Sequence, residues 1–147
     1  MDDNDLELRN LTYGLFVELG RAPTVAEVAD RARATIDDVR AGWGRLHEQH
    51  AIVLDADGER LRMANPFSAV QTSFCVEADG RTWYANGAWD AFGICAALHV
   101  DGRFETRCPD CGELLDVDVR DGRPGDESLV FHCLVPAARW WDDITFT

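Results

Sequence analysis

Lysine is absent from this sequence, and its 14 permanently cationic side chains are all arginines. A chain without lysine can form no Schiff base and has no Walker A lysine to hold a nucleotide phosphate. Positive charge is also scarce, because 27 aspartates and glutamates give a net charge of −13. A protein this acidic repels the phosphate backbone, so we expect no nucleic-acid partner.

Long apolar runs are missing as well. No segment approaches the ~20 apolar residues of a membrane-spanning helix, so we expect no membrane partner. The chain begins with the acidic residues Met-Asp-Asp-Asn-Asp, whereas a secretory signal peptide has a basic start. These features predict a cytoplasmic protein, in which thiols stay reduced. We therefore expect its five cysteines to be core residues, metal ligands or nucleophiles: Cys75, Cys95, Cys108, Cys111 and Cys133.

The N-terminal part has the pattern of three helices followed by a hairpin. Apolar residues recur with helical spacing over 6–19, and Thr24 and Thr35 are the expected N-caps of a second and a third helix. An Asp-Ala-Asp-Gly turn between two short apolar segments then predicts a β-hairpin. This is the layout of a winged-helix unit, which we assign to residues 1–65.

A winged-helix unit suggests DNA binding, with the third helix in the major groove. Here Asp37 and Asp38 stand at the start of that helix, where they would face phosphates, and two glycines weaken it. The alternative is a structural cap that packs on the rest of the chain. The charges favour the cap.

Residues 66–147 are expected to form a second unit, a small mixed β-sheet with a buried helix. The helix is predicted at 88–98, where the residues are apolar on all sides. The fold class is therefore α+β. The chain ends in an apolar, strand-like stretch at 144–147, from which we expect the natural protein to continue. The predicted strands are 72–77, 81–84, 103–107, 114–119 and 129–135.

A Cys-Pro-Asp-Cys-Gly motif between two predicted strands has the form of a zinc-knuckle turn. The thiolates of Cys108 and Cys111 can bind one soft ion, such as Zn(II) or Hg(II). A closed tetrahedral site needs two more ligands, and the candidates are His132, Cys133, His99 and Cys95. The alternatives are a turn with incidental thiols and a core thiol at Cys133, which shares its strand face with Leu129 and Phe131.

Asp90 falls within a helix that is otherwise apolar. A buried carboxylate is costly unless it is paired, and desolvation would raise its pKa. Such an acid is suited to hold and deliver a proton. It is equally suited to anchor the helix by hydrogen bonding, and the residues alone leave both interpretations open.

The segment around Asp90 resembles the signature Tyr-Ala-x-Cys-Ala-x-Asp-x-x-Gly of the alkylmercury lyase family. In this sequence it reads Tyr84-Ala85-Asn86-Gly87-Ala88-Trp89-Asp90-Ala91-Phe92-Gly93. The cysteine turn and the stretch from Val135 to Ile144 are also similar to that family. So is the N-terminal unit, which in the family is a cap that does not bind DNA.

The resemblance implies protonolysis of a carbon–mercury bond, in which two thiolates hold mercury and an aspartate gives a proton to the leaving carbanion. Asp90 matches the proton donor. The position of the first cysteine is Gly87 here, and the second would lie just beyond Thr147. We expect Gly87, Tyr84 and Asn86 to border a substrate pocket, in which the glycine leaves space for a ligand.

Three functions are compatible with these residues. A lyase needs at least two thiols that converge on Asp90, whereas a non-catalytic metal- or thiol-binding protein needs only Cys108 and Cys111. A divergent enzyme would use the space at Gly87 for another small molecule. The expected partner is a small molecule, an organomercurial or similar, and a homo-oligomer is compatible with the sequence. No cofactor is required, and any bound metal would be Hg(II) or Zn(II) on thiolates.

Overall fold

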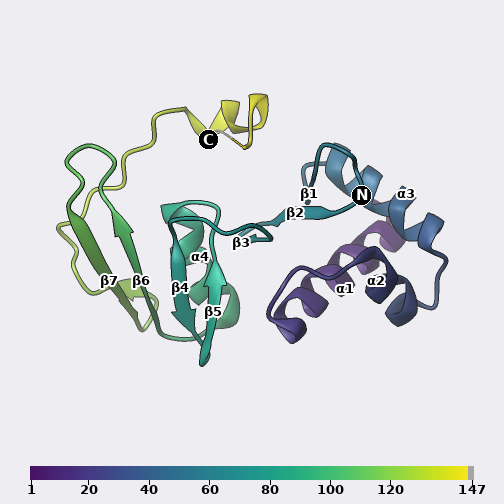
Figure 1. The fold of residues 1–147 in the computed structure, drawn as a ribbon, viewed down its shortest axis with the longest axis horizontal. Coiled ribbons are helices and arrows are strands. Elements are labelled where there is room, and N and C mark those ends of the chain that lie inside the picture. The colour runs from purple at the N-terminus through teal and green to yellow at the C-terminus, as the bar shows by residue number, and fades with distance from the viewer. Residues whose placement is uncertain (146–147) are drawn as a thin grey trace.

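Two sets of elements lie next to each other in the structure, a computed structural model that describes residues 1–145 (Figure 1). Three helices and a three-stranded sheet form the N-terminal part, and a five-stranded sheet with one helix forms most of the rest. This is the α+β class that the sequence predicts. Within residues 1–145, no helix combines the length and the apolar character that crossing a bilayer requires.

The N-terminal helices are α1 (Asp3–Leu19), α2 (Val25–Ala32) and α3 (Ile36–Glu48). Thr24 and Thr35 cap α2 and α3, as predicted, and each forms a capping box with the acid three residues later. Gly20 ends α1 in the left-handed conformation. The helix boundaries therefore follow from local residues.

Both arginines on the outer side of α3 are held by acids of the N-terminal part. Arg45 donates to the buried carboxylate of Asp5 at 2.7 Å, and Arg40 pairs with Glu59. These contacts occupy the positive charge that a recognition helix would offer to phosphates. They agree with the interpretation as a structural cap, which stays a prediction.

The first sheet consists of β1 (Val53–Leu54), β2 (Leu61–Ala64) and β3 (Phe67–Ser68) in the order β1-β2-β3, with antiparallel pairs. The β1–β2 hairpin lies where the sequence predicts it. Phe67 also bridges to Ala85, so that β3 joins the two sheets.

The second sheet has the order β5-β4-β6-β7-β8, and each of its pairs is antiparallel. The prediction of a mixed sheet was wrong. Helix α4 links β5 to β6, which run parallel to each other, but β4 lies between them and prevents a parallel pair. The elements are β4 (Cys75–Ala78), β5 (Arg81–Tyr84), α4 (Ala88–Leu98), β6 (Gly102–Arg107), β7 (Leu114–Arg120) and β8 (Arg123–Pro124).

Helix α4 covers one face of the second sheet. Ile94 and Cys95 are buried on its inner side, and Phe92 packs edge-on against Phe104 of β6, with ring centroids 5.2 Å apart. Trp89 on the outer side is 65% exposed. The prediction of a helix buried on all sides was therefore wrong, because the sheet covers only one side of it.

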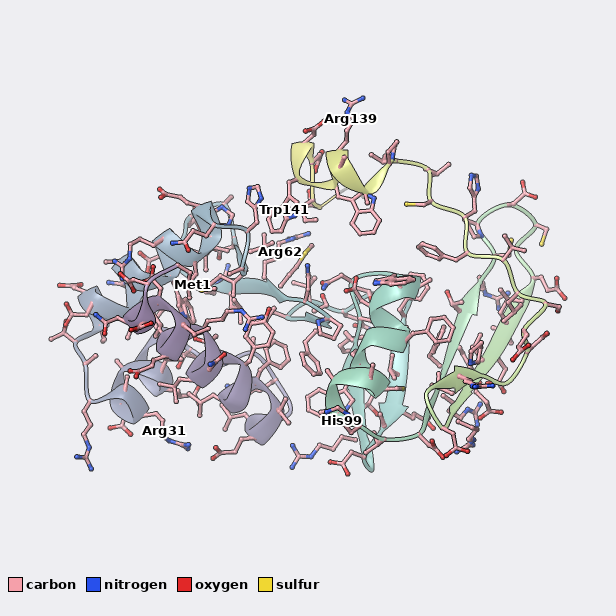
Figure 2. The ribbon with its side chains drawn as sticks, turned by 180° about the vertical axis from the view of Figure 1, so that it is seen from behind. Met1, Arg31, Arg62, His99, Arg139 and Trp141 are labelled. Carbon is pink, nitrogen blue, oxygen red and sulfur yellow. The ribbon has the colours of Figure 1, made fainter. Side chains whose placement is uncertain are left out.

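The segment after β8 contains no strand within the described residues, only a 3₁₀-helix, η1 (Ala137–Asp142). We predicted a strand at 129–135, but Val130 and Leu134 are 89% and 81% exposed. A strand needs a hydrogen-bonded neighbour, and this segment leaves the sheet without one. The segment then returns toward the N-terminal part, where Trp141 stacks on His50 with ring centroids 4.0 Å apart (Figure 2). The predicted strand-like end falls partly on 146–147, outside the described residues.

One hydrophobic cluster runs through both parts of the chain. Phe16 of α1 stacks on Phe67 of β3, and Phe67 tilts against Trp83 of β5; each pair has ring centroids 5.2 Å apart. All three rings are nearly inaccessible to solvent. The boundary between residues 65 and 66 stays a prediction, but the packing across it is continuous.

Candidate functional site

The residues singled out in the sequence lie where β5 ends and α4 begins. Tyr84 is the last residue of β5, Gly87 is the N-cap of α4, and Asp90 belongs to the first turn of this helix. The first hydrogen bond of the helix runs from the Ala91 N–H to the Gly87 carbonyl, at 3.0 Å. Gly87 provides no side-chain cap for the first N–H groups of α4.

Asp90 is a half-buried carboxyl group. Burial raises its pKa from an ordinary value of 3.8 to about 6, and no described cation lowers it again. Its charge also acts on Tyr13 of α1: burial raises the pKa of this phenol, Arg9 lowers it in part, and the Asp90 charge raises it again. At neutral pH, about a tenth of a carboxyl with this pKa is protonated, so it can both hold and release a proton.

Gly87 leaves open space on the same side of α4 as Asp90, three residues later. A Cβ atom at this position would meet no heavy atom within 4 Å, apart from its chain neighbours. Its φ of −162° is an extended conformation that any residue adopts. A cysteine would therefore fit here, and the missing thiol does not reflect a lack of room.

Asn86 and Tyr84 differ in their relation to this space. Asn86 Nδ2 donates to Asn65 Oδ1 at 2.9 Å and so ties the start of α4 to the N-terminal part. Its Oδ1 is buried without a partner among the described residues. Tyr84 alternates with Trp83, whose sheet face is the one that α4 covers. The side chain of Tyr84 is therefore directed to the opposite face, away from α4.

Aromatic residues of the C-terminal segment contact both parts of the chain, one of them beside the site, and no pattern in the sequence predicts these contacts. The ring centroids of Phe131 and Trp89, the neighbour of Asp90, are 6.1 Å apart. Trp141 stacks on His50, which follows α3. The segment between these contacts arches over the N-terminal end of α4 (Figures 1 and 2). The paired residues are far apart in the chain, and no periodic pattern connects them.

All five cysteines are free thiols, and apart from Cys108 and Cys111 they lie in separate places. Cys95 is a packing residue, because a Cβ at Gly102 would meet its sulfur at 2.7 Å; burial raises the pKa of this thiol. Cys133 is exposed and donates to a backbone carbonyl at 3.0 Å, so the interpretation as a core thiol was wrong. Cys108 and Cys111 share the β6–β7 turn. In the described chain no three metal-ligating side chains gather, and Cys133 does not join this pair.

Residues 67–147, more than half of the chain, match the family model for alkylmercury lyase. Among solved structures, the fold is similar to the "mercury-bound form of MerB2", with a TM-score of 0.68 and 24% identity over 86% of this chain. The chain spans 60% of the length of that structure. The comparison with curated proteins gives no match. By its family match, the chain belongs to the alkylmercury lyase family.

Proposed function

We propose that this protein cleaves carbon–mercury bonds by protonolysis, with Asp90 as the proton donor. The observation that carries the proposal is the environment of Asp90, a partly buried carboxyl with a pKa of about 6 and no described counter-ion. A carbanion that leaves mercury needs a proton as the bond breaks, and a carboxyl poised near neutral pH supplies one. Family membership supports mercury as the metal of the substrate.

The proposed reaction consumes an organomercurial bound to one thiolate, R–Hg–SR′, and a second thiol. The proton of Asp90 passes to carbon while the electron pair of the carbon–mercury bond becomes a carbon–hydrogen bond, and R–H leaves. The second thiol then binds mercury as a thiolate and returns its proton to Asp90. Mercury remains Hg(II) throughout, so the reaction needs no oxidant or reductant.

Gly87 explains how a thiol from outside the protein can take part. The open space beside it accommodates a small thiol where a cysteine side chain would otherwise lie. Trp89 and Phe131 offer an apolar border for the hydrocarbon group of the substrate. The proposed substrate is thus an organomercurial that arrives as its adduct with a small thiol.

The test is hydrocarbon release from a phenylmercury compound in the presence of excess small thiol, with benzene measured by gas chromatography. We expect Asp90→Asn to lower release at least about 100-fold, because the amide cannot donate an acidic proton. Release by the unaltered protein should also fall about tenfold per pH unit above pH 6, as Asp90 ionises. Asp57→Asn, in an exposed turn, is the matched control. Equal release by Asp90→Asn and this control would contradict the proposal.

A second variant tests the position of the thiol. Gly87→Cys places a thiol beside Asp90, and we expect it to release hydrocarbon at thiol concentrations too low to support the unaltered protein. Gly44→Cys is the control, because its Cβ also meets no atom within 4 Å but lies on α3. If both variants behave alike, the space at Gly87 does not hold the mercury ligand.

Acid catalysis on a different small molecule is the second candidate function. Gly87 favours it, because a site without its own thiolate at this position does not by itself select a metal. No hydrocarbon release from either the unaltered protein or the folded Gly87→Cys variant would favour this candidate over the lyase.

A further inference from the structure

The Cys108–Cys111 turn and Asp90 lie at the same end of the second sheet, beyond the C-terminal ends of two of its strands. Strands β5 and β6 are each antiparallel to β4, so they run in the same direction and their C-terminal ends lie at the same end of the sheet (Figure 1). There β5 leads to Gly87 and the start of α4, while β6 leads directly to Cys108. Two strand spacings, about 10 Å, separate β5 from β6.

The turn holds its two sulfur atoms together. The Cys108 N–H donates to the Glu113 carbonyl and the Gly112 N–H donates to the Cys108 carbonyl, both at 2.9 Å. Gly112 has a φ of +76°, which a side chain would strain. The backbone N–H groups of Cys111 and Asp110 donate to the Cys108 sulfur, and the Cys111 thiol bonds to it as well.

We propose that Cys108 and Cys111 form a separate mercury site, a two-thiolate clamp that binds Hg(II) as a linear S–Hg–S unit. Two S–H bonds release their protons to solvent and two S–Hg bonds form, with no change in oxidation state. The number of ligands selects the metal. Structural Zn(II) takes four ligands, whereas no third ligating side chain joins the pair within residues 1–145. A soft ion that two thiolates satisfy fits the clamp.

The surroundings of the clamp favour uptake and exchange of a cation. Asp110 and Glu113 flank the sulfurs, and the chain carries a net charge of −13, which attracts Hg(II). Cys111 is exposed, so a thiol in solution can reach the bound metal. The clamp would also give Hg(II) released near Asp90 a ligand in the same molecule; this last step alone rests on the proposed function.

The test is titration of the reduced, full chain with Hg(II) against a competing small thiol. Bound metal is counted by native mass spectrometry, and thiolate coordination is followed by ultraviolet charge-transfer absorbance. We expect one tightly bound Hg(II), with affinity lowered at least about 100-fold in Cys108→Ser and in Cys111→Ser, because the chelate is lost. The matched controls Cys133→Ser and Cys75→Ser should retain it. Unchanged binding in Cys108→Ser, or loss in Cys133→Ser, would overturn the proposal, as would equally tight Zn(II) binding.

Asp90→Asn separates the clamp from the lyase reaction. This variant should bind Hg(II) as tightly as the unaltered protein while it releases no hydrocarbon. Tight Hg(II) binding that depends on Cys108, without hydrocarbon release by any form, would leave the clamp standing and remove the lyase. Hydrocarbon release, combined with Hg(II) binding that ignores Cys108, would do the reverse.

Discussion

Asp90 retains its proton to higher pH than an ordinary aspartate because water is partly excluded from it and no described cation faces it. Its pKa is about 6 in the folded chain, against 3.8 for an ordinary aspartate. Between these values the folded state binds more protons than the unfolded state, so stability falls as the pH rises through this window. Above it, the cost of the buried charge is fully present.

Asp90→Asn should therefore stabilise the fold above pH 6, even though it removes the proposed proton donor. We expect a gain of about 1–2 kcal/mol after allowance for partial exposure, which should fade as the pH falls toward 3.8. Urea unfolding at several pH values measures it. A gain that does not vary with pH would mean that the carboxyl is not desolvated. Asp57→Asn again provides the control.

Asp90 could be predicted as a site residue from the sequence, because an acid within an apolar helix is unusual. Gly87 could be linked to it because it lies three residues earlier. The sequence could not show that Asp90 lacks a counter-ion, because that depends on which side chains of other elements face it. Cys133 illustrates the same limit. Its expected burial relied on strand alternation, and the residue lies in a segment that forms no strand.

At the scale of elements, α3 contains two glycines in different surroundings. A Cβ at Gly44 would meet no atom within 4 Å, whereas one at Gly42 would clash with Leu8 Cδ2. Gly44→Ala should therefore stabilise the protein by about 0.5–1 kcal/mol, because alanine loses less backbone entropy in a helix. In Gly42→Ala, displacement of Leu8 should cancel or reverse this gain. Parallel urea titrations compare the two, and equal stabilisation would show that α1 and α3 are not closely packed.

Elements that are fixed by local residues were predicted well. The caps at Thr24 and Thr35 and the hairpin with the Asp-Ala-Asp-Gly turn depend on groups within a few residues, and all are present. Elements that depend on a distant partner were not. The apolar pattern at 129–135 resembles a strand, but pairing requires a neighbouring edge. The order of the strands, which excludes a parallel pair, has no local signal either.

At the scale of the whole molecule, the junction between the two parts is aromatic and closed to solvent. Phe67 lies between Phe16 and Trp83 and is 2% exposed. Asn86 and the bridge between Phe67 and Ala85 add polar links across the same junction. The N-terminal part therefore helps to position the start of α4, where Asp90 lies, and its packing belongs to the architecture of the site.

A chain that shares one core should unfold in one step, and Phe67→Ala tests this. Loss of the buried ring should cost about 3–5 kcal/mol, a large part of the 5–15 kcal/mol that is typical of a domain. Far-UV circular dichroism reports mainly the helices. In a Trp43→Phe background, which removes the buried tryptophan of α3, fluorescence reports only the second part and the C-terminal segment, and both midpoints should fall together. Leu114→Ala, at a position 55% exposed, should move neither by more than about 0.5 kcal/mol. A fluorescence midpoint that falls alone would mean that the two parts unfold independently, and that the N-terminal part does not support the site.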